Sequence, residues 1–122
     1  LVTYSNEAKI LQLGVKTETL TQFGAVSKQT VIEMAMGVRK ALGVEVGCSV
    51  SGVAGPSGGS NEKPVGTIWF GLSTPAETFA WTTQVGHTRE LNRSRSVILT
   101  LEALRRTLVG ESRLPRGVLK QL

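Results

Sequence analysis

A glycine-rich stretch between Ser51 and Lys63 is the segment whose composition most strongly suggests a ligand site. It holds four of the fourteen glycines of the chain. Glycine loses more backbone entropy on folding than other residues, so such a cluster indicates a specific need, often the close approach of N–H groups to an anion. The spacing matches neither the P-loop nor the dinucleotide fingerprint, and a flexible surface loop is the alternative. We predict substrate-binding residues at Ser51, Gly52, Gly55, Gly58, Gly59 and Lys63.

A tyrosine and a lysine near the start of the chain form a second candidate. Tyr4 lies at the expected end of a strand, and Lys9 follows about one helical turn later. A lysine that is removed from water loses part of its preference for the charged form and can act as a general base. The alternative is a capped amphipathic helix with an exposed lysine, and the spacing alone favours that alternative.

Arg89 and Arg93 lie near the expected N-terminus of the last helix. Positive side chains are poor partners for the positive end of a helix dipole, so they suit a position beside a bound phosphate or carboxylate. An ordinary solvated helix face explains them equally well. His87, the single histidine of the chain, is expected to cap this helix or to lie on the surface.

Alternating helix and strand patterns are expected to position these candidates. Apolar spacing and capping residues predict helices over residues 7–13, 17–23, 28–43 and 88–109, with Thr17 as the cap of the second. Strands are expected over residues 2–4, 44–50, 67–72 and 78–85; the last two form an antiparallel hairpin, and 44–50 is buried on both faces. The expected core stripe of the last helix is Val97, Ile98, Leu101, Leu104 and Leu108.

This order of elements predicts an α/β fold in which helices pack on a mixed sheet. Residues 1–109 are expected to form one domain and residues 110–122 a loosely held tail. The formal net charge is +5 and the hydrophobic content is 40%, which is ordinary for a soluble domain. The basic C-terminal half is better explained by a solvated face and a small-anion site than by a nucleic-acid groove.

Composition also restricts the compartment and the chemistry. No apolar run is long enough to span a bilayer, and no signal segment opens the chain, so we expect no membrane partner. The single cysteine, Cys48, excludes an internal disulfide and favours a reducing, cytoplasmic location. Cys48 is expected to be a small buried hydrophobe, and one cysteine with one histidine makes a protein-only zinc site a poor expectation.

Three segments together resemble the C-terminal domain of the competence/damage-inducible protein CinA, the nicotinamide-mononucleotide (NMN) amidohydrolase family. They are residues 2–9 (VTYSNEAK), residues 24–27 (GAVS), and residues 51–69, which begin with SGVAGP and end with PVGTIW. The segments occur in the order expected for the family. The likeness extends from Leu1 to about Leu108, which is nearly the whole chain.

The resemblance implies a three-layer α/β/α sandwich, a homodimer and hydrolysis of the NMN carboxamide to nicotinic acid mononucleotide and ammonia. It implies a role in bacterial pyridine-nucleotide recycling, without a metal or another cofactor. Tyr4 and Lys9 match the family's tyrosine and lysine motif, and either Arg89 or Arg93 matches its arginine. We assign Arg89 to catalysis and Arg93 to substrate binding.

The family's proposed nucleophile is a serine in the motif A-E-S-C-T-G-G, and the 122 residues do not contain this motif. The missing initiator methionine also suggests a fragment. We therefore expect the chain as it stands not to hydrolyse NMN, with Ser5 or Ser51 as possible substitutes for the nucleophile. The alternative function is a non-catalytic nucleotide-binding or interaction module of a competence/damage-inducible protein.

Overall fold

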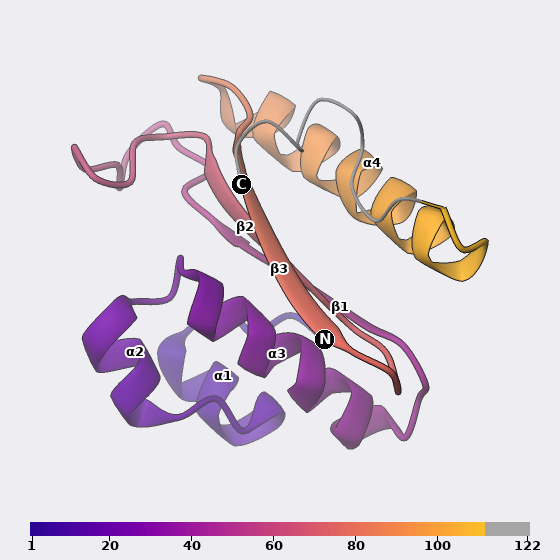
Figure 1. Cartoon of the computed structure of the whole chain (residues 1–122). Coiled ribbons are helices and arrows are strands. Elements are labelled where there is room, and N and C mark those ends of the chain that lie inside the picture. Colours follow the sequence, from indigo (N-terminus) through magenta and orange to yellow (C-terminus); the bar gives the residue numbers. More distant parts are fainter. Residues whose placement is uncertain (112–122) are drawn as a thin grey trace.

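The computed structural model describes residues 1–111, and these residues form helices on both sides of a small sheet (Figure 1). No helix among them is long and apolar enough to cross a membrane. In chain order the elements are α1 (Asn6–Leu13), α2 (Thr17–Phe23), α3 (Lys28–Leu42), β1 (Gly47–Gly52), β2 (Thr67–Ser73), β3 (Thr78–Gln84) and α4 (Arg89–Leu108). The predicted α/β class is confirmed, and the predicted loose tail falls almost entirely outside the described residues.

Local capping chemistry explains where the helices begin and end. The Ser27 hydroxyl accepts a hydrogen bond from the Thr30 N–H at the start of α3, and Gly43 ends that helix with a φ of 62°. Ser5 caps α1 in the same way, through the N–H of Ala8. Thr17 is the first residue of α2 and not its cap, because the capping position belongs to Lys16, whose side chain makes no capping hydrogen bond.

The three strands pair in the order β1-β2-β3, and both pairings are antiparallel. The expectation of a mixed sheet is therefore wrong for the described residues. A parallel pairing needs a crossover connection, usually a helix, and no helix lies between these strands. The loop of residues 53–66 joins β1 to β2, and a hydrogen bond from the Val53 N–H to the Thr67 carbonyl closes its base. The predicted β2–β3 hairpin is confirmed.

Strand β1 lies at an edge of this sheet, and the expectation that it is buried on both faces is wrong, because not all of its side chains are covered. Its Val50 side chain is 40% exposed. The strand also starts at Gly47 instead of residue 44, because the N–H of Val44 still bonds the Arg39 carbonyl at the end of α3. The expected strand over residues 2–4 is absent from the structure, and these residues take no regular form.

Helix α3 lies against one face of the sheet, on the same side as α1 and α2, and α4 lies on the other (Figure 1). The α3 contact is close because small residues line the sheet: the Ser49 hydroxyl donates to the Val31 carbonyl at 2.6 Å. At Gly71 an added Cβ would lie only 2.3 Å from that carbonyl oxygen. The opposite face carries the larger core, built around Phe70 and Trp81.

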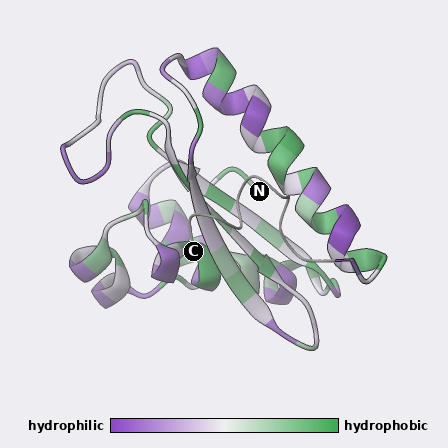
Figure 2. Ribbon diagram, turned by 45° about the horizontal axis from the view of Figure 1, so that its top comes forward, coloured by the Kyte–Doolittle hydropathy of each residue, from purple (hydrophilic) through white to green (hydrophobic). Residues whose placement is uncertain are grey.

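The predicted core stripe of α4 is wrong for four of its five residues. Hydrophobic and hydrophilic residues alternate along this helix in Figure 2. The residues that α4 buries are Asn92, Ser96 and Ala103. The buried side of α4 thus carries small and polar residues, while Leu99 and Leu104 pack partly against the core. The exposed members of the predicted stripe are Val97, Ile98, Leu101 and Leu108.

Candidate active site

A cleft of about 780 Å³ lies between the N-terminal segment and strand β1 with the loop that follows it. The structure brings together in its lining most of the residues that were predicted from the sequence: Tyr4, Lys9, Ser51, Gly52, Gly55, Gly58 and Arg89. Gly59, Lys63 and Arg93 do not line this cleft. Predicted residues from three separate parts of the chain therefore meet at one site.

The Lys9 side chain lines this cleft and is only 5% exposed. Its Nζ donates a hydrogen bond of 2.7 Å to the Thr3 carbonyl and a longer one of 3.5 Å to the Tyr4 carbonyl. Burial lowers the pKa of the Lys9 ammonium, because removal from water disfavours the charged form. The interpretation of Lys9 as an exposed surface lysine is wrong. The Tyr4 side chain, in contrast, is 86% exposed at the cleft.

The glycine loop, residues 53–66, extends from the end of the sheet next to the start of α4 (Figure 1). Gly55 has a φ of 85°, and an added Cβ would lie 2.5 Å from the Val65 side chain, so both conformation and space require glycine there. Within residues 1–111, the N–H groups of Gly55, Ser57 and Gly58 donate to no protein acceptor. Such free backbone donors, beside an arginine, are suited to an anion.

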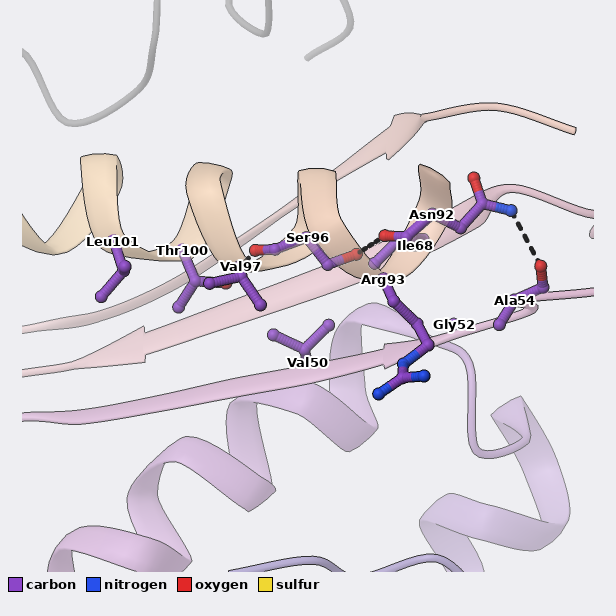
Figure 3. A pocket seen from close by; sticks show the side chains of 10 residues that line it. All are labelled: Val50, Gly52, Ala54, Ile68, Asn92, Arg93, Ser96, Val97, Thr100 and Leu101. Atoms are coloured by element: carbon purple, nitrogen blue, oxygen red, sulfur yellow. Dashed lines mark hydrogen bonds between the residues drawn. The ribbon is translucent and has the colours of Figure 1, made fainter. Parts of the chain in front are cut away.

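Of the two candidate arginines, only Arg89 lines the cleft, where its Nη1 donates to the Gly55 carbonyl at 3.3 Å. Arg93 lies one helical turn further on and lines a second groove of about 460 Å³ between α4 and β1. Figure 3 shows the Arg93 side chain extending past Gly52 at this groove. The geometry therefore favours Arg89 as the residue that would meet a ligand in the cleft.

Lys63 has a structural partner in place of a ligand. Its Nζ donates to the Phe23 carbonyl at the end of α2, at 2.8 Å, and so ties the glycine loop to the α2–α3 connection. Ser51 acts similarly, since its hydroxyl donates to the Ala25 carbonyl at 2.7 Å. Lys63 does not line the cleft, and its predicted role in substrate binding stays a prediction.

Neither serine proposed as a substitute nucleophile has its hydroxyl bonded to the Lys9 amine. The Ser5 hydroxyl caps α1, and the Ser51 hydroxyl is directed at Ala25. The Lys9 amine is held by two backbone carbonyls and pairs with no described hydroxyl. An activated nucleophile needs a base within hydrogen-bond reach, so neither serine has the geometry for that role.

No described residues form a group of three or more His, Cys, Asp or Glu side chains that could hold a metal ion. Cys48 lines the cleft and is partly buried, and burial raises the pKa of its thiol, which favours the protonated and less reactive form. Burial thus shifts the pKa of two residues of this cleft, Lys9 towards the uncharged amine and Cys48 towards the protonated thiol.

Sequence reasoning missed two groups: the Thr3 carbonyl, which holds Lys9, and the Asn92 side chain of α4, which bonds the loop. A signal for Asn92 does exist, because Asn92 lies four residues before Ser96 and eleven before Ala103, on the buried face of α4. A polar side chain at such a position indicates a specific hydrogen-bond partner.

Comparison with known proteins shows the family of this chain. The model of the CinA C-terminal domain matches residues 1–108. The chain belongs to the CinA C-terminal domain family. The resemblance read from the sequence is thereby confirmed. A CinA-like protein of Kosmotoga olearia is 47% identical over 109 residues, which are 89% of this chain and 26% of that protein.

Two further relatives have a similar length of match to this CinA domain. The nicotinamide-nucleotide amidohydrolase PncC of Shigella flexneri is 47% identical over 104 residues, which are 84% of this chain and 63% of that protein. The crystal structure of the competence/damage inducible protein CihA from Agrobacterium tumefaciens is 42% identical, with a TM-score of 0.82 over 84% of this chain and 64% of that one. The chain thus spans less than two thirds of the length of each of these relatives.

Proposed function

We propose that this CinA domain binds NMN in the cleft and supplies the proton-transfer groups for hydrolysis of its carboxamide to the acid and ammonia. The observation that carries the proposal is the Lys9 amine, which lines the cleft, is almost fully buried and has a lowered pKa. The name of the Shigella flexneri relative supports the choice of substrate.

The proposed reaction assigns one task to each group of the cleft. The uncharged Lys9 amine takes the proton from an attacking hydroxyl and passes it to the departing ammonia, and water then hydrolyses the acyl intermediate. Arg89 and the free N–H groups of the glycine loop bind the phosphate or the developing oxyanion. Tyr4, at the cleft rim, orients the substrate or relays the proton. The serine that the family resemblance implies as nucleophile is not among the 122 residues.

Ammonia release from NMN tests this proposal, measured with a coupled dehydrogenase on the complete gene product. We expect turnover that Lys9→Met lowers by about 10²–10⁴-fold without unfolding the protein. Tight binding of NMN without ammonia release would support the alternative, a non-catalytic nucleotide-binding module. Absence of both binding and turnover would refute the proposed function. We further propose that the protein acts in the cytoplasm as a homodimer. Gel filtration with light scattering measures the molar mass and so checks the homodimer.

A further inference from the structure

The Asn92 side chain is fully buried where α4 meets the glycine loop. Its Nδ2 donates a hydrogen bond of 2.9 Å to the Ala54 carbonyl, and Figure 3 shows this contact as a dashed line. Arg89, one turn earlier, donates to the next carbonyl, that of Gly55. The first turns of α4 therefore hold two consecutive peptide groups of the loop.

The Ala54–Gly55 peptide is trans, and in a trans peptide the C=O and the N–H point in opposite directions. Because Asn92 holds the Ala54 oxygen, the Gly55 N–H on the same peptide must point away from α4. Gly55 lines the cleft, and this N–H donates to no described acceptor. The next peptide offers no donor, since Pro56 lacks an N–H. The Asn92 bond thus sets the direction of the only N–H between Ala54 and Pro56.

The other polar atom of Asn92 indicates that this side chain does not serve stability alone. Its Oδ1 is buried and has no hydrogen-bond partner among the described residues. An unpaired buried acceptor costs free energy, whereas an apolar side chain of the same size would avoid that cost. A residue chosen only for packing at this position would be leucine. The donor atom is what asparagine adds.

We infer that Asn92 is a positioning residue for the cleft: it fixes the Ala54–Gly55 peptide so that the Gly55 N–H faces a bound anion. The anion is a phosphate or an oxyanion of the substrate. In its identification of the ligand as NMN, this inference rests on the proposed function. Asn92 does not touch the ligand and acts through the loop.

The test uses the ¹⁵N-labelled chain with two probes, NMN and inorganic phosphate, and follows the Gly55 amide resonance together with the Kd of each probe. We expect the wild-type Gly55 resonance to shift on binding. Asn92→Leu keeps the number and branching of the side-chain heavy atoms and removes both polar atoms. It should raise the Kd at least about tenfold, which corresponds to one lost hydrogen bond to a charged group, and should abolish the Gly55 shift.

The stability of the variants separates positioning from simple structural damage. Asn92→Leu should leave the urea midpoint nearly unchanged, because it also removes the unpaired Oδ1. Ser96→Ala is the matched control: this buried hydroxyl on the same helix face bonds the Asn92 carbonyl and does not contact the loop. It should lower the urea midpoint and leave the Kd unchanged. If Asn92→Leu does not fold, Asn92→Asp replaces the donor with an acceptor at equal size and should weaken binding likewise.

Each result bears on one conclusion only. A folded Asn92→Leu or Asn92→Asp chain that binds its probe as tightly as wild type overturns the positioning role. A wild-type Gly55 amide that responds to phosphate but not to NMN refutes the proposed substrate and leaves the inference standing. A Gly55 amide that responds to neither probe overturns the inference itself.

Discussion

Replacement of Lys9 by methionine is the perturbation that tests the central feature of the cleft. Methionine keeps most of the apolar stem and removes the amine, so the cavity left behind is small. The amine contributes one good hydrogen bond, the 2.7 Å contact to the Thr3 carbonyl, worth about 1.5–3 kcal/mol for a charged donor. The 3.5 Å contact to the Tyr4 carbonyl is too long to add much. Against this stands the cost of keeping an ammonium group out of water.

These opposing contributions predict a small net change in the free energy of unfolding near neutral pH, about 2 kcal/mol or less in either direction. The pH dependence is the sharper result. Burial lowers the pKa of Lys9 below its ordinary value of 10.5. Below the folded-state pKa the group is charged in both states and the folded state bears the full desolvation cost. Above 10.5 it is neutral in both states and the cost vanishes. The stability of wild type relative to Lys9→Met must therefore rise with pH between these two limits.

Urea unfolding of both proteins from about pH 7 to about pH 11 measures this rise, and ¹⁵N or ¹³C NMR of the lysine side chain measures the pKa itself. The rise in the free energy of unfolding must equal about 1.36 kcal/mol for each unit by which NMR finds the Lys9 pKa lowered. Lys28→Met, which removes an exposed lysine, controls for the general loss of one positive charge. A wild-type advantage that stays constant or falls with rising pH would refute the reasoning. In the complete gene product, Lys9→Met should also reduce NMN turnover by about 10²–10⁴-fold.

Three further measurements test the packing and the loop. Gly71→Ala should lower the free energy of unfolding by about 1–3 kcal/mol, because its Cβ would lie 2.3 Å from a carbonyl oxygen of α3; a wild-type urea midpoint would contradict this. Lys63→Met removes the bond to the Phe23 carbonyl and should speed hydrogen exchange of the loop amides and weaken NMN binding, with a stability loss of about 1–2 kcal/mol. Unchanged exchange would show that this bond does not hold the loop. The hydrogen bond from Arg105, above all, lowers the pKa of Glu102 to about 2, so its stabilising effect should be present above the ordinary carboxyl pKa and disappear as the pH falls towards 2. A ¹³C titration midpoint of Glu102 near its ordinary value would contradict that ion pair.

For Lys9, the family resemblance predicted more about the site than the residue spacing did. Spacing alone favoured an exposed Lys9, whereas the resemblance assigned it to catalysis, and the structure places its side chain in the cleft and out of solvent. The glycine loop could be read directly, since glycines with positive φ are a local requirement of the chain path. The hydrogen bond between Lys63 and the end of α2 could not be predicted from the sequence. The two groups lie forty residues apart, and neither segment contains a pattern that indicates its partner.

The sequence by itself determined the local elements of this protein. The α3 boundaries follow from Ser27 and Gly43, and the β2–β3 turn follows from its own residues, because caps and turns are satisfied within a few positions. The tertiary structure alone decided which faces are buried. It made β1 an edge strand and turned Asn92 inward while Leu101 stayed exposed. Burial depends on what distant segments bring to each face, and hydrophobic periodicity cannot reveal which side of a helix a distant sheet will cover.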